Sequence, residues 1–247
     1  MSKKLVVANW KMNGNIDFVK EFFNSFSEQQ NRQVETVFCP PFPLIQTIQN
    51  YAKAKIGAQD CHHEEKGAYT GEVSSQLLSD FNVDYVIVGH SERREYHKET
   101  SGLVNKKASS AIKNGILPII CVGETLEERN NDTYKDVIST QIVESVPNHI
   151  NADKLIVAYE PVWSIGTGKI PGNGDILEVF EIIREKLQDH LIDRDIDIDK
   201  VRILYGGSVN SGNCDTIKGI SYLGGYVVGS ASLKPAEFNV LVQSLEG

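Results

Sequence analysis

The chain has 247 residues, of which 40% are hydrophobic and 23% are charged, and its formal net charge is −8. This acidic balance disfavours nucleic acid or an anionic membrane surface as a partner, because both bind basic patches. No apolar run approaches the roughly 20 residues of a membrane helix, and the start of the chain carries no signal-peptide core, so we expect a cytoplasmic globular protein without a membrane partner.

Short β-branched runs recur along the chain, each followed by a helical pattern, which is typical of repeated βα units around a parallel sheet. The candidate strands are Leu5–Ala8, Thr36–Cys39, Lys55–Ala58, Tyr85–Val88, Leu117–Val122, Leu155–Tyr159, Arg202–Tyr205 and Tyr226–Val228. Eight strands close a (β/α)8 barrel, a fold of about 250 residues. We therefore predict an α/β protein, with residues 1–247 forming a single-domain (β/α)8 barrel.

The segments between these strands show apolar residues at helical spacing. The clearest run from Ile16 to Ser27 and from Ile176 to Leu187. Pro43 and Pro235 stand where two further helices are expected to begin, because proline suits the first helical turn. No linker or low-complexity stretch interrupts the alternation, in agreement with one domain.

In a barrel of this kind, the residues directly after each strand form the active face. An amide, a cation, an imidazole, a carboxylate and two glycine-rich turns follow these strands. The candidates are Asn9 and Lys11 after the first strand, His90, Ser91 and Glu92 after the fourth, Glu160 after the sixth, Ser208 after the seventh, and Gly229 and Ser230 after the eighth.

The stretch from Ala158 to Lys169 places Glu160 at the tip of a strand, where Pro161 forces the chain to turn. The residues that follow are too apolar for an ordinary solvated loop, and Gly166 begins a segment with backbone freedom. We predict a lid hinged beside a catalytic carboxylate. A surface ion pair followed by a loop packed for stability is the alternative.

Glu160 and His90 suit proton abstraction beside a carbonyl group. The carboxylate would remove a carbon-bound proton, and the imidazole would polarise the oxygen that becomes negative. Because His90 begins a helical turn, we expect the neutral imidazole. A lid that excludes water would strengthen both effects.

The glycine-rich turns with Ser208, Gly229 and Ser230 can offer backbone N–H groups to a phosphate dianion. Tight βα connections with no ligand are the alternative. Lys11 would supply a local positive charge in this acidic chain, or it is a surface lysine beside an acid.

The four cysteines lie far apart with no C-x-x-C pair, and the histidines show no metal-binding spacing. We therefore expect reduced, individually packed thiols, no metal site and no cofactor. Cys121 stands out because it lies near the end of a strand.

Several motifs match one known family in the right order. They are Ala8–Gly14, Gly67–Glu72, Gly89–Arg94, Ala158–Trp163 with Ile165–Lys169, Tyr205–Asn210 and Ala231–Pro235. Across essentially its whole length, the chain resembles the triosephosphate isomerase family, whose fold is the TIM barrel. The resemblance implies interconversion of dihydroxyacetone phosphate and D-glyceraldehyde 3-phosphate, in glycolysis and gluconeogenesis, without a cofactor.

By matched position, the resemblance implies a role for each candidate residue. Glu160 is the base and His90 the electrophile, while Asn9 and Lys11 bind substrate. Ser91 and Glu92 support the site. The phosphate is held by backbone N–H groups of Gly166, Ser208, Gly229 and Ser230.

The resemblance also implies a homodimer. The segment from about Asp60 to Glu72 would insert beside the other active site, with Thr70 near the partner's Asn9 and the partner's Lys11. A long surface excursion is the alternative, but such length without obvious structure favours a functional role.

Three positions depart from the family pattern. Gly224 stands where an acidic residue is usual, which removes one possible ion pair. Ser230 stands where glycine is usual, and its N–H can still serve phosphate. Pro171 stands where alanine is more common, and we expect it to narrow the motion of the lid.

Two other functions have to be weighed against the isomerase: a different phosphate-binding barrel isomerase or epimerase, and a non-catalytic binding protein on the same fold. The first needs four matched catalytic positions to coincide by accident. The second would be expected to show substitution at Glu160 or Lys11, and neither is substituted.

Overall fold

The computed structural model describes residues 3–26, 33–165, 170–192 and 197–246. Eight parallel strands close into a barrel in chain order, with β8 pairing back to β1. They are β1 (Lys4–Asn9), β2 (Val34–Cys39), β3 (Lys55–Ala58), β4 (Tyr85–Val88), β5 (Leu117–Val122), β6 (Ile156–Tyr159), β7 (Arg202–Tyr205) and β8 (Leu223–Val228). The predicted (β/α)8 barrel is confirmed.

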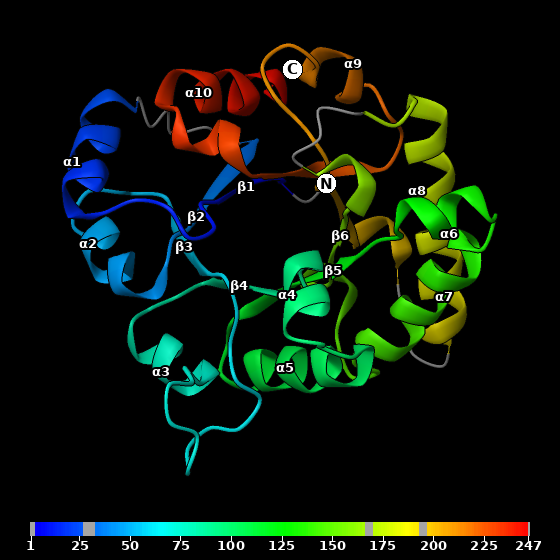
Figure 1. Cartoon of the computed structure of the whole chain (residues 1–247), viewed down its shortest axis with the longest axis horizontal. Coiled ribbons are helices and arrows are strands. Elements are labelled where there is room, and N and C mark those ends of the chain that lie inside the picture. The colour runs from blue at the N-terminus through cyan, green and yellow to red at the C-terminus, as the bar shows by residue number, and fades with distance from the viewer. Residues whose placement is uncertain (1–2, 27–32, 166–169, 193–196, 247) are drawn as a thin grey trace.

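Helices surround the strands (Figure 1). The α-helices are α1 (Ile16–Ser25), α2 (Ile45–Gln49), α3 (Ser75–Asp80), α4 (Ser91–Tyr96), α5 (Ser101–Lys113), α6 (Leu126–Asn130), α7 (Tyr134–Ser145), α8 (Asn173–His190), α9 (Cys214–Ile217) and α10 (Pro235–Ser244). No helix in the described part of the chain is both long and apolar enough to cross a membrane.

The strands are buried on both faces, which explains why they read as nearly continuous apolar runs. On β1, Leu5 and Val7 belong to the cluster inside the barrel, whereas Val6 and Ala8 belong to the cluster between strands and helices. This period of two follows from the pleat. It fixes which side chain of each strand faces the interior.

Strand β8 begins three residues earlier than predicted, because two glycines hide it in the sequence. Gly225 pairs with Leu5 and has a φ of +143°. A Cβ atom there would lie 1.8 Å from the carbonyl oxygen of Leu5. Glycine is therefore required where β8 passes β1.

The helix starts have local causes in the sequence. The side chain of Asn15 caps α1 by accepting a hydrogen bond from the backbone N–H of Phe18 (2.8 Å). Pro235 opens α10, and Pro43 lies in a short 3₁₀ turn, Phe42–Leu44, that leads into α2. The helix predicted over 176–187 is longer, because α8 extends to Asn173 and His190.

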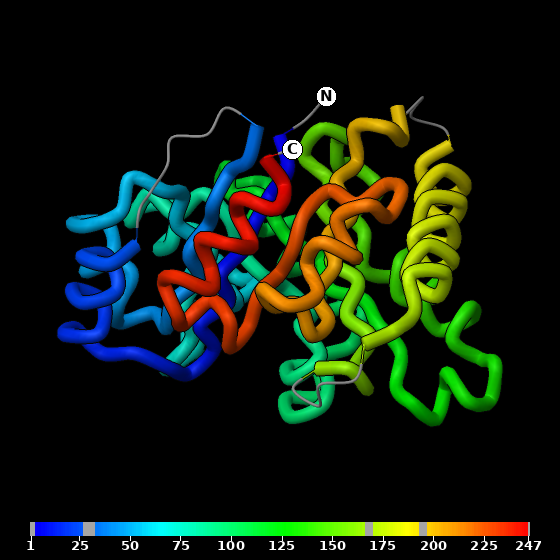
Figure 2. The backbone as a smooth tube through the Cα atoms, turned by 90° about the horizontal axis from the view of Figure 1, so that it is seen from above, coloured from blue at the N-terminus to red at the C-terminus, as the bar shows by residue number. Residues whose placement is uncertain are grey.

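The connections that follow β4, β5 and β6 gather at one end of the barrel, at the lower edge of Figure 2. Parallel strands bring their carboxyl ends to the same rim.

Candidate active site

A cavity of about 510 Å³ opens at the carboxyl ends of the strands. Seven of the residues predicted from the sequence line it: Asn9, Lys11, His90, Glu160, Ser208, Gly229 and Ser230. They come from connections that are far apart in the chain. The closed barrel is what brings them together.

Glu160 is buried, with only 1% of its surface exposed. Its backbone N–H donates to the carbonyl of Val122 (2.8 Å), so the ladder continues one residue beyond β6 and fixes the start of the side chain. Its Oε2 accepts a hydrogen bond from the backbone N–H of Ser91 (3.1 Å). Its Oε1 is buried and accepts no hydrogen bond within the described residues. One carboxylate oxygen is thus anchored and the other is available.

His90 caps helix α4 with its own side chain. Its Nδ1 accepts a hydrogen bond from the backbone N–H of Glu92 (3.2 Å). A ring nitrogen that accepts a hydrogen bond carries no proton, so the proton of the neutral imidazole lies on Nε2. Nε2 is 3.5 Å from Oε1 of Glu160. A potential donor and a potential base therefore face the same space.

Lys11 lies in a left-handed backbone conformation with a φ of +51°. Its backbone N–H donates to Oδ1 of Asn9 (3.1 Å), and its Nζ pairs with Oε1 of Glu92 at 2.5 Å. Strained non-glycine residues are typical of functional sites. The two contacts aim the ammonium group along the wall of the cavity.

Ser91 and Glu92 do not line the cavity themselves. They act on residues that do, through the Ser91 N–H bond to Glu160 and the Glu92 pairing with Lys11.

Sequence reasoning missed Gln59, the first residue after β3. Its side-chain amide donates to the carbonyl oxygens of Lys11 (2.7 Å) and Cys39 (2.9 Å). It thereby ties the turn after β1 to the end of β2. Its place at the end of a strand was the signal that could have found it.

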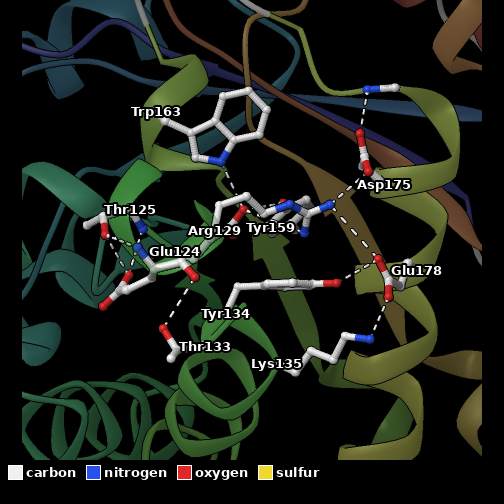
Figure 3. Close-up of polar contacts among 12 residues, drawn as sticks. Glu124, Thr125, Arg129, Thr133, Tyr134, Lys135, Tyr159, Trp163, Asp175 and Glu178 are labelled. Carbon is white, nitrogen blue, oxygen red and sulfur yellow. Dashed lines mark hydrogen bonds and ion pairs between the residues drawn. The ribbon is translucent and has the colours of Figure 1, made fainter. Parts of the chain in front are cut away.

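Sequence reasoning also missed Glu124, which follows β5. Its carboxylate is fully buried and accepts hydrogen bonds from Tyr159 Oη (3.0 Å) and Trp163 Nε1 (2.9 Å), as Figure 3 shows. These two donors stand just before and just after Glu160 in the chain.

Gly166 and the predicted lid segment 166–169 lie outside the described residues. Of the predicted phosphate-binding positions, Ser208, Gly229 and Ser230 are described and lie on one wall of the cavity. The Oγ of Ser208 donates to the carbonyl of Ser164, which ties this wall to the segment after Glu160.

All four cysteines are free and buried, as predicted. Burial and the nearby charge of Glu160 raise the pKa of the Cys121 thiol well above its usual value. Among the described residues, no group of three or more histidine, cysteine, aspartate or glutamate side chains is placed to hold a metal ion.

Comparison with known proteins agrees with this arrangement. A sequence model of the triosephosphate isomerase family matches residues 4–245. The chain belongs to the triosephosphate isomerase family.

The chain is similar to individual members of the triosephosphate isomerase family over almost their whole length. The chain is 42% identical to the triosephosphate isomerase of Hyphomonas neptunium over 243 residues, which cover 96% of each chain. It is 41% identical to that of Dictyoglomus thermophilum over 251 residues, covering 99% of this chain and all of the relative. The protein is therefore an isomerase that interconverts dihydroxyacetone phosphate and D-glyceraldehyde 3-phosphate, a step of glycolysis.

The contact between Gly206 and Glu160 yields a prediction. A Cβ atom on Gly206 would lie 2.9 Å from Cγ of Glu160, so Gly206→Ala should displace the carboxylate. We expect kcat to fall about tenfold or more, because small displacements of a reacting group are costly. The far-UV circular dichroism spectrum should not change.

Gly174→Ala is the matched control, since a Cβ atom there meets nothing within 4 Å. Steady-state kinetics of both variants check the prediction. Wild-type kcat in Gly206→Ala would contradict the assigned position of Glu160.

Proposed function

We propose that the cavity carries out the isomerisation by proton transfer through an enediolate, with Glu160 as the general base and His90 as the electrophile. The observation that carries this proposal is the 3.5 Å approach of His90 Nε2 to the buried Oε1 of Glu160. A base and a hydrogen-bond donor at one point can act on adjacent atoms of the same substrate.

In the forward direction, Glu160 removes a proton from carbon 1 of dihydroxyacetone phosphate. The electron pair of that C–H bond forms the carbon–carbon double bond of the enediolate, and the carbonyl oxygen becomes negative. Nε2–H of His90 donates to this oxygen and helps to move a proton between the two oxygens. Return of a proton from Glu160 to carbon 2 gives the aldehyde. These steps move only protons, so we propose no cofactor.

The surrounding residues stabilise the charges that develop. Lys11 and Asn9 bind the substrate, and the ammonium group offsets the negative charge of the enediolate and the phosphate. Ser91 holds the resting position of the base through its N–H group. Glu92 positions both Lys11 and the ring of His90.

The phosphate would bind on the wall formed by the turns after β7 and β8. Backbone N–H groups of Ser208, Gly229 and Ser230 are the proposed donors, with Gly166 completing the set. Supporting this, the three described positions line the same cavity as Lys11.

We also propose that residues 1–247 form one catalytic domain, that the protein is cytoplasmic, and that it acts as a homodimer. Supporting the dimer, the segment between β3 and α3 protrudes from the barrel (Figure 1). Tyr69 on that segment is 44% exposed, and Met12 beside the site is 95% exposed. A partner would cover this apolar surface, with Thr70 near the partner's Lys11.

Replacement of the proposed base gives the first test of function. Glu160→Asp withdraws the carboxylate from the substrate carbon while leaving the phosphate wall intact. We expect kcat to fall by about 10²-fold and KM to change only about twofold. A coupled assay of isomerisation measures both constants. An equal loss in kcat and in affinity would contradict the role of Glu160 as base.

The proposed dimer is tested by sedimentation velocity. The wild-type protein should sediment at twice the chain mass of 27.4 kDa. Met12→Arg places a charge on the proposed contact and should shift the protein toward the monomer.

Ile192→Arg is the control for this substitution, because Ile192 is 70% exposed at a position outside the proposed contact. It should leave the mass unchanged. Sedimentation of the wild type at the mass of a single chain would rule out the dimer.

A further inference from the structure

A network of charged and aromatic side chains lies next to the cavity, between β6, α6, α7 and α8 (Figure 3). Its innermost member is Glu124, whose Oε1 holds both Tyr159 and Trp163. Burial raises the pKa of this carboxyl group. A buried carboxylate is costly unless a cation compensates it.

Arg129, on α6, is the cation that faces Glu124. Its Nη1 lies 4.0 Å from Oε1 of Glu124, and among the described residues this is the one ion pair of that carboxylate. Both Nη1 of Arg129 and Oε2 of Glu124 are buried, and neither has a hydrogen-bond partner among the described residues. Arg129 is therefore the one described cation that pairs with the Glu124 carboxylate, beside the hydrogen bonds from Tyr159 and Trp163.

Arg129 also contacts three other residues, one of which is Glu178, 3.9 Å from its Nη2. Its guanidinium stacks on the ring of Tyr134, with Cζ 4.0 Å from the ring centroid. Its Nη2 binds Oδ1 of Asp175 at 2.9 Å, in the first turn of α8. The planar guanidinium lies on a ring while the donors at its edge bind carboxylates.

Asp175 extends the connection to the backbone. Its Oδ2 accepts a hydrogen bond from the N–H of Gly172 (3.0 Å). Arg129 thus joins Trp163, two residues after Pro161, to the chain just before α8 begins. One guanidinium group is therefore linked, through Glu124, to Trp163 before residue 166 and, through Asp175, to Gly172 after residue 169.

We propose that Arg129 is a positioning residue of the isomerisation: it holds the Glu124 carboxylate, and through Glu124 it fixes Tyr159 and Trp163 on either side of Glu160. The proposal rests on the proposed role of Glu160 as the base. Arg129 does not line the cavity, so it acts through other residues and not on the substrate.

Arg129→Met tests the proposal by removing the charge and the hydrogen-bond donors of the guanidinium group while keeping a long apolar side chain. We expect kcat to fall about tenfold with KM within about twofold, because the phosphate wall is untouched. Arg129→Lys keeps the charge but not the planar set of donors, and it should therefore lose less kcat than Arg129→Met.

Lys135→Met is the matched control. Lys135 is a cation of the same network that is half exposed and pairs with Glu178 at 2.9 Å, whereas the described ion pair of Glu124 is with Arg129. This variant should keep wild-type kcat.

A spectroscopic measurement separates positioning from a general effect on folding. The chain contains two tryptophans, Trp10 and Trp163. In protein labelled with 5-fluorotryptophan, the ¹⁹F resonance of Trp163, assigned with Trp163→Phe, should shift in Arg129→Met. The resonance of the fully buried Trp10 should stay in place.

Asp175→Asn provides a second variant if Arg129→Met does not fold. Asparagine keeps an oxygen for the N–H of Gly172 but loses the charge that binds Arg129. We expect a smaller fall in kcat, about twofold to threefold, and a shift of the Trp163 resonance in the same direction.

The proposal is overturned if the soluble variants keep wild-type kcat and an unmoved Trp163 resonance. That outcome differs from failure of the proposed function, in which Glu160 variants would keep full turnover whatever Arg129 does. The ¹⁹F shift is read without substrate, so it reports on Arg129 independently of the catalytic role of Glu160.

Discussion

A buried carboxylate governs the architecture of this site. Glu160 is 1% exposed at the end of β6, and an ionised group removed from water needs compensation by hydrogen bonds or charge. One oxygen receives the N–H of Ser91, and the other faces the ring of His90. Everything that positions α4, β6 and the turns around them therefore also positions the proposed base.

The barrel meets this requirement by distributing the site over many strands. β1 supplies Asn9 at its last position, and the turn that follows supplies Lys11, while β4 leads into His90 through Gly89, whose φ is +68°. A Cβ atom at Gly89 would clash with Val104 at 2.7 Å. Glycine there lets the chain turn so that His90 caps α4 and still faces Glu160. The geometry of the site thus depends on how the helices pack against the strands.

Much of this was predictable from the sequence, because it depends on local pattern. His90 and Glu160 are candidates because each is a polar residue that follows an apolar strand. Pro161 also marks Glu160 as the point where the chain must turn. The start of β8 was hidden, since Gly224 and Gly225 lack the side chains that mark a strand. Gln59 contacts Lys11, 48 positions away, and Arg129 contacts Asp175, 46 positions away. No local sequence pattern encodes such pairs.

The central claim is that Glu160 exchanges a carbon-bound proton of the substrate. Incubation of dihydroxyacetone phosphate with the protein in D₂O, followed by ¹H NMR, tests this most directly. The account predicts deuterium at carbon 2 of the D-glyceraldehyde 3-phosphate formed by the wild type, and no exchange with Glu160→Gln, which should still bind inorganic phosphate. Exchange by Glu160→Gln at the wild-type rate would contradict it.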